Sequence, residues 1–311
     1  MAYKILVTGG AGFIGSEFVR QSVDHSDWKL VVVDALTYAG DLKRIKEVDR
    51  DIRFHKIDIC SKEKLEVLFK REKFDALVHF AAETHVDRSL QDNTPFIRTN
   101  ILGTQYLIDL SLKYALRSFI HISTDEVYGQ SLKGFFKESA PLKPRNPYAV
   151  TKASGELLVQ AAIHTFGLPA VIVRPSNNYG PWQYPEKLIP VIISRALNDR
   201  TVPVYGKGHQ IREWLHVADC VKGIMLVLEK GKPGDIYNIG SCFEQKNIDT
   251  VKTILKVLGK KGSLIRFVPD RPGHDYRYSV NYSKIRQLGW RAQISFADGI
   301  KSTIAWYKSN S

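Results

Sequence analysis

The first fifteen residues constrain the fold of this chain more than any other segment. Residues 4–8 form a short apolar run, the glycines Gly9, Gly12 and Gly15 follow at once, and a segment with helical periodicity comes next. This order predicts a strand, a tight turn and a helix. Glycine lets the backbone turn sharply and come close to a ligand, while the helix N-terminus offers free N–H groups and a partial positive charge. Such a turn is suited to binding a pyrophosphate.

A second strand pattern supports this interpretation. Residues 30–33 are a continuous apolar run of the kind buried on both faces of a parallel sheet, and Asp34 ends it roughly 20 residues after the glycines. A carboxylate there accepts hydrogen bonds from adenosine ribose hydroxyls and repels a 2′-phosphate, which favours NAD over NADP. The alternative is that Asp34 only begins the following loop. The glycine spacing is not the G-x-G-x-x-G of the classical fingerprint, so the motif depends on its context.

Strand and helix patterns alternate along the following residues. Strands are expected over residues 52–57, 76–80, 118–122 and 170–174, and helices are expected to start at Ser61, at residues 93–95 and at Pro147. The second of these helices should run without interruption to about Tyr114. An alternating order with short turns predicts an α/β fold, a doubly wound parallel sheet of the Rossmann type with right-handed crossovers.

The pattern changes after residue 174, which indicates a second, smaller lobe. Residues 175–187 are rich in Pro, Asn and aromatic side chains, a composition suited to a loop that fixes a sugar. We therefore expect an NAD-binding domain over residues 1–174, to which segments of about 208–239 and 282–311 return. The smaller C-terminal lobe, residues 175–207 and 240–281, would bind the substrate.

The composition of the chain favours some classes of binding partner over others. The net charge of +13 is compatible with nucleic-acid binding, but lysines and arginines are spread along the 311 residues without a long basic block, which favours a small anionic substrate. No apolar run of eighteen residues and no signal-peptide layout are present, so we expect a cytoplasmic protein without membrane contact. The cysteines Cys60, Cys220 and Cys242 lack a short paired spacing, which argues against disulfides and against a metal site.

The segment 123–152 carries the residues suited to catalysis. Thr124, Asp125 and Glu126 come directly after an expected strand, at the sheet edge where open α/β proteins place their chemistry. Tyr148 and Lys152 lie one turn apart on a helix. An ammonium beside a phenol, whose pKa is ordinarily about 10, favours the phenolate and makes it a usable base. The alternative is that Tyr148 and Lys152 are an ordinary pair of exposed side chains on the surface of one helix.

Two arginines in the C-terminal half are candidates for binding a diphosphate. Arg212 and Arg271 stand in polar, glycine-containing segments, and a guanidinium binds phosphate through a bidentate fork. Each could instead be an ordinary surface arginine.

These motifs together resemble the extended short-chain dehydrogenase/reductase superfamily. Within it, three strings, residues 81–89, 176–190 and 270–275, resemble the dTDP-glucose 4,6-dehydratases, and the likeness covers nearly the whole chain. Relatives that only epimerise at C4 or decarboxylate lack an adjacent acid pair such as Asp125-Glu126. The resemblance therefore implies a hydro-lyase that acts in deoxysugar biosynthesis, of which the dTDP-rhamnose pathway is one example.

The resemblance also implies a three-step reaction. Tyr148, assisted by Lys152 and Thr124, takes the C4 hydroxyl proton while hydride passes to NAD. Glu126 then removes the C5 proton and Asp125 protonates the departing C6 hydroxyl, after which the hydride returns to C6. Eliminating a poor leaving group needs an acid and a base together, and neighbouring carboxyl groups can hold different protonation states.

The resemblance assigns further residues to two ligands. NAD, which would stay bound through each turnover, is expected to contact Gly9, Gly12, Phe13, Ile14, Gly15, Asp34, Asp58, Ile59, Ala81, Ala82, Thr99, Tyr148, Lys152 and Asn177. The nucleotide sugar is expected to contact Thr84, Asn178, Lys187, Leu188, Pro203, Tyr205, Arg212, Asn247, Arg271, His274 and Tyr278. Members of the family typically dimerise, so a homodimer is expected through a four-helix bundle built from the helices that start near Pro95 and Tyr148.

Several departures from the family pattern keep alternatives open. Glu213, His216, Ala218, Tyr276 and Asn281 stand where other residues are usual, and the link from Gly129 to Tyr148 is short. UDP-glucose could therefore replace dTDP-glucose as the substrate. A C4 epimerase, a UDP-glucuronate decarboxylase, and a non-catalytic NAD-sensing or RNA-binding protein on this fold are further alternatives, against which the complete catalytic set argues.

Overall fold

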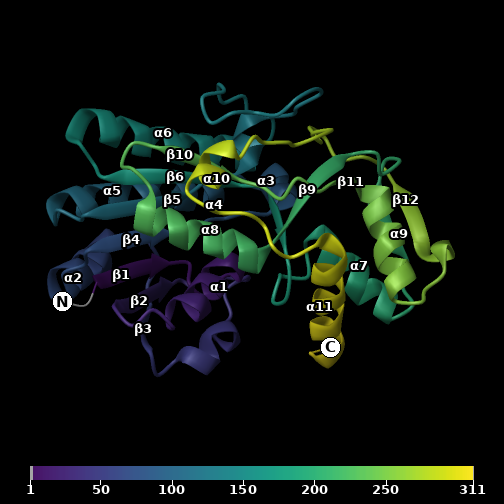
Figure 1. The fold of residues 1–311 in the computed structure, drawn as a ribbon, viewed down its shortest axis with the longest axis horizontal. Coiled ribbons are helices and arrows are strands. Elements are labelled where there is room, and N and C mark those ends of the chain that lie inside the picture. The colour runs from purple at the N-terminus through teal and green to yellow at the C-terminus, as the bar shows by residue number, and fades with distance from the viewer. Residues whose placement is uncertain (1–2, 311) are drawn as a thin grey trace.

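A seven-stranded sheet forms the centre of the computed structural model, which describes residues 3–310 (Figure 1). Its strand order is β10-β6-β5-β4-β1-β2-β3, and every neighbouring pair is parallel. The strands are β1 (Tyr3–Thr8), β2 (Trp28–Asp34), β3 (Ile52–Lys56), β4 (Ala76–His79), β5 (Ser118–Ile122), β6 (Ala170–Pro175) and β10 (Ile236–Ile239). The order reverses between β1 and β4, and open parallel sheets bind ligands at such a reversal.

Helices cover both faces of this sheet, as its alternating side chains require. Ile5 and Val7 of β1 pack with α1 (Phe13–Ser22), α8 (Val217–Lys230) and α10 (Ser283–Gln287). Leu6 points to the opposite face, which α2 (Lys62–Glu72), α5 (Thr104–Lys113) and α6 (Pro147–Phe166) cover. The doubly wound parallel sheet predicted from the sequence is therefore confirmed.

The expected long helix from residue 93 to about residue 114 is interrupted. It consists of α4 (Thr94–Phe96), a π-helical segment η2 (Ile97–Gly103) and α5, and Asp92 rather than Asn93 accepts the hydrogen bond from the backbone N–H of Thr94. Gly103 packs so closely on Ile59 that a Cβ atom added to Gly103 would lie 2.6 Å from the Cδ1 atom of Ile59. The helical spacing of apolar residues in the sequence does not reveal such tertiary packing. Short π-helical segments are frequent at functional sites.

Helix α6 has the ends that its sequence indicates. The side chain of Asn146 accepts a hydrogen bond from the backbone N–H of Ala149, Pro147 occupies the first turn, and Gly167 ends the helix with a φ of +66°. The helix is buried along much of its length, with Tyr148, Lys152 and Glu156 all inside the protein.

A second group of elements packs around a separate apolar cluster. Helices α7 (Leu188–Leu197), α9 (Asn247–Val257) and α11 (Phe296–Ser309) surround it at the right of Figure 1. Two small sheets accompany them: β7 (Asn177–Tyr179), β9 (Ile211–His216) and β11 (Glu244–Lys246), and β8 (Val202–Tyr205) with β12 (Ile265–Val268). The remaining elements are α3 (Val86–Gln91) and the 3-10 turns η1 (Leu42–Val48), η3 (Asp125–Tyr128) and η4 (Gly262–Leu264). The division into two domains stays a prediction.

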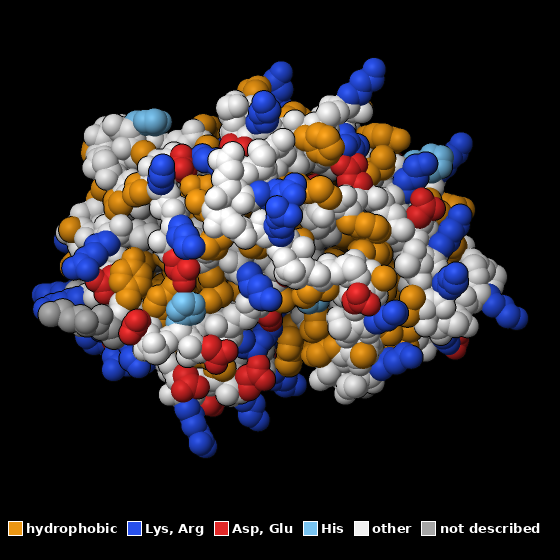
Figure 2. Space-filling view, in the orientation of Figure 1, with side chains coloured by type: hydrophobic (Ala, Val, Ile, Leu, Met, Phe, Trp, Pro, Cys, Tyr) orange, Lys and Arg blue, Asp and Glu red, His pale blue; other side chains and the backbone are white. Residues whose placement is uncertain are grey.

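Positive charge is dispersed over the face of the molecule that Figure 2 shows. Lysine and arginine side chains are scattered over the face shown in Figure 2, with acidic side chains between them. Among residues 3–310, no helix combines the length and apolar character needed to cross a membrane.

Candidate active site

Two cavities open at the carboxyl edge of the central sheet. The smaller, of about 120 Å³, lies over the glycine turn after β1, and we call it the glycine-turn cavity. The second, of about 300 Å³, lies between the sheet and the elements around α7 and α9, and we call it the large cavity. Glu83 lines the first and His85 lines the second, so the segment after β4 joins them.

Backbone atoms shape the glycine-turn cavity. Gly9 adopts a φ of +70°, and a Cβ atom there would lie 2.5 Å from the backbone nitrogen of Ala81. A Cβ atom on Gly15 would overlap the carbonyl oxygen of Gly9. Both positions therefore require glycine, because the turn brings three backbone segments into contact.

Most of the residues expected to contact NAD line this cavity. They are Gly9, Gly12, Asp34, Asp58, Ile59, Ala81, Ala82 and Thr99. Phe13, Ile14 and Gly15 form the first turn of α1 beside it, and Asn177 lines the large cavity instead. Tyr148 and Lys152 are buried in α6 and line neither cavity.

Asp34 is held in place by backbone groups. Its Oδ2 atom accepts a hydrogen bond from the N–H of Ala11 at 3.0 Å and its Oδ1 atom accepts one from the N–H of Leu36 at 2.8 Å. Burial raises the pKa of Asp34 above its usual range, and these two bonds oppose the rise. Because a carboxylate offers about four acceptor positions, two remain for ribose hydroxyls. The residues of this cavity therefore fit a dinucleotide without a 2′-phosphate.

The turn after β5 presents an acid pair. The Thr124 hydroxyl donates to Asp125 Oδ1 at 3.2 Å and accepts from the N–H of Glu126 at 3.3 Å. Burial, followed by the charges of Glu126 and Glu213, raises the pKa of Asp125 well above its usual range. The Oδ2 atom of Asp125 is buried without a hydrogen-bond partner among the described residues. Asp125 is thus prepared to hold a proton and to donate it.

Glu126 faces the large cavity and is oriented from two sides. Its Oε2 atom accepts hydrogen bonds from Asn146 Nδ2 at 3.1 Å and from the Tyr278 hydroxyl at 3.2 Å. The two acids of the pair therefore occupy different surroundings, one enclosed and one beside the cavity. Such a difference separates an acid role from a base role.

Tyr148 and Lys152 are buried, which excludes an ordinary exposed helix pair. The expectation that Lys152 lowers the pKa of Tyr148 is wrong for this structure, where burial and then the charge of Glu126 raise that pKa. Lys152 Nζ donates to the carbonyl of Ile122 at 2.6 Å, and burial lowers the pKa of Lys152 to about 8. A side-chain hydrogen bond with Thr124 opposes this rise in the pKa of Tyr148.

Ten of the eleven residues expected to contact the sugar nucleotide line the large cavity. They are Asn178, Lys187, Leu188, Pro203, Tyr205, Arg212, Asn247, Arg271, His274 and Tyr278. Thr84 does not line it, but its carbonyl accepts a hydrogen bond from Lys187 Nζ at 2.7 Å. The side-chain oxygens of Asn177, Asn178 and Asn247 are buried without partners among residues 3–310, as expected of groups directed at a ligand.

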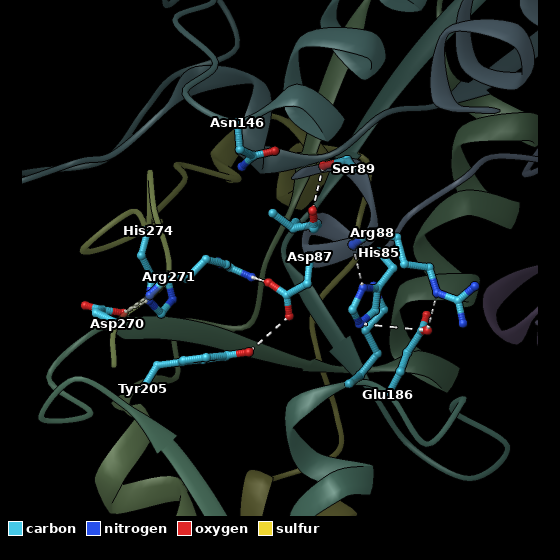
Figure 3. Close-up of polar contacts among 12 residues, drawn as sticks. His85, Asp87, Arg88, Ser89, Asn146, Glu186, Tyr205, Asp270, Arg271 and His274 are labelled. Atoms are coloured by element: carbon cyan, nitrogen blue, oxygen red, sulfur yellow. Dashed lines mark hydrogen bonds and ion pairs between the residues drawn. The ribbon is translucent and has the colours of Figure 1, made fainter. Parts of the chain in front are cut away.

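Arg212 and Arg271 both enter the large cavity. Arg212 is buried, and its Nη2 atom donates to the carbonyl of Asp275 at 3.0 Å. Arg271 pairs with Asp87 at 3.3 Å, and the hydroxyl of Tyr205 donates to the same carboxylate at 3.3 Å (Figure 3). Neither arginine is an ordinary surface residue, and their two guanidinium groups supply the positive charge that a diphosphate requires.

Sequence reasoning missed Asp87 and a cluster around Glu186. Asp87 lies within residues 81–89, a string noted for its resemblance, but nothing in one sequence shows that it faces Arg271 across 184 positions. Glu186 accepts a hydrogen bond from the Tyr38 hydroxyl at 3.0 Å, and the Arg88 guanidinium stacks 3.6 Å above the Tyr38 ring. Figure 3 shows His85 and Arg88 directed at Glu186. This cluster joins the loops of the two cavities.

The fold and the site together define an extended short-chain dehydrogenase/reductase. The family model described as GDP-mannose 4,6 dehydratase matches residues 6–303, so the chain belongs to that family. Within the described residues, no group of three His, Cys, Asp or Glu side chains is arranged to hold a metal ion.

The similar proteins include enzymes named dTDP-glucose 4,6-dehydratase. One, from Streptomyces niveus, is 46% identical over 99% of this chain and 93% of its own length. The crystal structure of DesIV, a dTDP-glucose 4,6-dehydratase from Streptomyces venezuelae with NAD and TYD bound, matches with a TM-score of 0.96 and 45% identity, covering 99% of this chain and 97% of that one. A UDP-glucose 4-epimerase from Thermotoga maritima reaches a TM-score of 0.93 at 29% identity, covering 99% of each chain. The shared fold therefore does not separate the two reactions, and the site residues must do so.

Proposed function

We propose that this protein catalyses the NAD-dependent dehydration of dTDP-glucose to dTDP-4-keto-6-deoxyglucose. The observation that supports this most strongly is the acid pair in η3, where Asp125 is enclosed with a raised pKa and Glu126 faces the large cavity. A C4 epimerase requires a base for the C4 hydroxyl but has no need of a second acid and base for C5 and C6. The pair therefore favours a dehydratase.

The glycine-turn cavity would hold NAD. Gly9 and Gly12 would border the pyrophosphate, Asp34 would accept the adenosine ribose hydroxyls, and Asp58 with Ile59 would lie beside adenine. When bound, NAD supplies an acceptor for the C4 hydride and later returns that hydride to C6. Because the cofactor ends each turnover in its starting state, we expect it to remain bound.

The first proton transfer belongs to helix α6. Tyr148, in its deprotonated form, would accept the proton of the C4 hydroxyl, and a hydrogen bond with the Thr124 hydroxyl, which opposes the rise in the pKa of Tyr148, would stabilise that form. Lys152 lies buried one turn away on the same helix. Oxidation at C4 produces a ketone, which makes the C5 proton acidic.

The elimination belongs to turn η3. Glu126, oriented by Asn146 and Tyr278, would take the C5 proton. Asp125 would donate its proton to the C6 hydroxyl, so that the C6–O bond breaks and water leaves. The electron pair of the C5–H bond forms the C5–C6 double bond. Proton transfers of this kind contribute about 10²–10⁴-fold in rate.

The large cavity would hold the nucleotide diphosphate. Arg212 and Arg271 would contact the phosphate oxygens, and the unpartnered side-chain oxygens of Asn178 and Asn247 would accept hydrogen bonds from the ligand. The five positions that depart from the family pattern, Glu213, His216, Ala218, Tyr276 and Asn281, are all absent from the cavity lining. They therefore give no reason to prefer UDP-glucose over dTDP-glucose.

The proposal is tested by incubating the purified protein with dTDP-glucose and, separately, UDP-glucose in D2O. Product that has lost water and carries deuterium at C5 supports proton removal at C5, and the faster substrate identifies the nucleotide. A product with inverted C4 and no loss of water would make the protein an epimerase. Recovery of unchanged sugar, with NAD also supplied, would contradict the proposal for both substrates.

We further propose a homodimer through α6 and the helical segment that contains η2. Val150 and Leu157 are exposed apolar side chains two turns apart on α6, and Ile97 and Leu102 are exposed on η2. Replacing Leu157 with glutamate should convert the dimer to a monomer in light scattering, whereas replacing the exposed Val67 of α2 should not. A wild-type monomer at micromolar concentration would contradict this assembly.

A further inference from the structure

A buried polar network connects helix α6 to strand β6. Arg174, in β6, and Glu156, on α6, are 1% and 0% exposed. Arg174 Nε donates to Glu156 Oε2 at 3.0 Å, and Arg174 Nη2 donates to the other carboxylate oxygen. Enclosing two charges is costly even when they pair, and apolar side chains of similar size are often no less stable. The pair therefore calls for an explanation beyond stability.

The same arginine also holds the end of turn η3. Arg174 Nη1 donates to the hydroxyl of Tyr128 and, at 3.1 Å, to the carbonyl of Glu138. Its guanidinium carbon lies 4.5 Å from the centre of the Tyr128 ring. The Tyr128 hydroxyl donates in turn to Asn238 Oδ1, on β10, at 2.8 Å. Four N–H groups of one planar guanidinium are thereby directed at fixed partners.

The two ends of this network carry the two halves of the candidate catalytic machinery. Tyr128 closes the turn that presents Asp125 and Glu126. Glu156 lies one helical turn beyond Lys152 and two beyond Tyr148. We infer that Arg174 and Glu156 are positioning residues that set the acid pair of η3 against the base on α6.

The two halves differ in how firmly the rest of the fold holds them. Helix α6 has 20 residues and packs on the sheet and α5, whereas η3 has only four residues, packs on α6 and ends at Tyr128. Loosening the network should therefore displace the acid pair more than the base. Lysine cannot replace Arg174, because its single ammonium lacks the planar fork that reaches both partners.

This inference rests on the proposed function, and it predicts a separation of two steps. Two variants loosen the network: Tyr128→Phe removes one hydroxyl, and the double variant R174M/E156L replaces both charges with apolar groups. In single turnovers, C4 oxidation should stay near the wild-type rate while water elimination slows about tenfold or more, since displacements near 1 Å can cost about a hundredfold. Reduced cofactor, visible at 340 nm, should then accumulate.

Tyr237→Phe is the matched control, because it removes the hydroxyl of another buried tyrosine. The Tyr237 hydroxyl donates to Asp235 at 3.0 Å and not to Arg174, Glu156 or Tyr128. This variant should leave both steps unchanged. Equal slowing of oxidation and elimination in the network variants, or no slowing in either, would overturn the inference.

Hydrogen exchange provides a readout that does not depend on activity. The backbone amides of Val127 and Gly129 donate within the turn, to Thr124 and Glu126. They should exchange faster in the network variants, while amides in the middle of α6 keep their protection. If the wild type fails to dehydrate either sugar, the proposed function fails, and this exchange pattern still decides whether the network positions η3. Unchanged exchange at both amides would overturn the inference.

Discussion

Helix α6 and turn η3 present their reactive groups from elements of very different length. Tyr148 and Lys152 sit within a long buried helix, and burial is the main influence on the pKa of each. Asp125 and Glu126 sit in a four-residue turn, where neighbouring carboxylates add to the effect of burial on Asp125. Under the proposed function, the helix would serve oxidation and the turn would serve elimination. The following variants test that division.

Tyr148→Phe should have the largest effect, because both steps depend on oxidation at C4. Product formation should fall by about 10³-fold or more, within the range of lost acid–base catalysis, and no reduced cofactor should form. Rapid-mixing absorbance at 340 nm measures both. Tyr106→Phe, on α5 and outside both cavities, is the control. Reduced cofactor formed at the normal rate by Tyr148→Phe would assign the first proton transfer to another group.

Glu126→Gln and Asp125→Asn should slow product formation by about 10²–10⁴-fold while leaving C4 oxidation intact. Both side chains keep their shape, so the turn should keep its backbone bonds. Reduced cofactor should therefore accumulate in these variants, in contrast to Tyr148→Phe. Parallel loss of oxidation and product would remove the division between helix and turn.

Arg271→Met should act on binding rather than on either proton transfer. Hydrogen bonds to charged groups contribute about 1.5–3 kcal/mol, so KM should rise by about 10–100-fold with a smaller change in kcat. Arg266→Met is a matched control, because Arg266 is exposed on β12 and does not line the cavity. A fall in kcat at unchanged KM would place Arg271 in the chemistry instead.

Glu213→Gln should have the smallest effect on the rate at neutral pH, but it tests whether the charge of Glu213 contributes to the raised pKa of Asp125. Burial raises the pKa of Glu213 to about 7, and above that pH its charge favours protonated Asp125. Removing the charge lowers the pKa of Asp125, so activity should begin to fall at a lower pH than in the wild type. An unchanged pH profile would exclude this coupling.

Glu213 also gives the folded protein a defined pH dependence. Between its ordinary pKa of 4.5 and about 7, the folded chain holds a proton that the unfolded chain has released. Its contribution to stability is therefore lost as pH rises through that window and is constant above it. The free energy of unfolding, measured with urea across this pH range, should decline less steeply with pH in Glu213→Gln than in the wild type.

The sequence predicted the features that depend on neighbouring residues. The glycine turn, Asp34 at the end of β2 and the ends of α6 follow from local periodicity and capping residues. The π-helical η2 was missed because the spacing of apolar residues does not distinguish an α-helix from a short π-helical segment within it. The pKa of Tyr148 was predicted in the wrong direction, since burial and not the spacing to Lys152 dominates it.

Within the large cavity, the resemblance supplied residues that no local pattern could connect. Arg271 and Tyr205 come from distant segments and meet at Asp87, which a single sequence does not reveal. The sequence indicated which side chains were suited to binding a sugar nucleotide. It did not show which of them hold one another in place.

The most direct test of the account follows one atom through both halves of the site. Wild-type protein is given dTDP-glucose that carries deuterium at C4, and the product is analysed by mass spectrometry and NMR. Oxidation at α6 followed by elimination at η3 predicts a product that has lost water and carries the deuterium at C6. Deuterium found again at C4 of a sugar that keeps its C6 hydroxyl would contradict the account, because the acid pair would then have no part in the reaction.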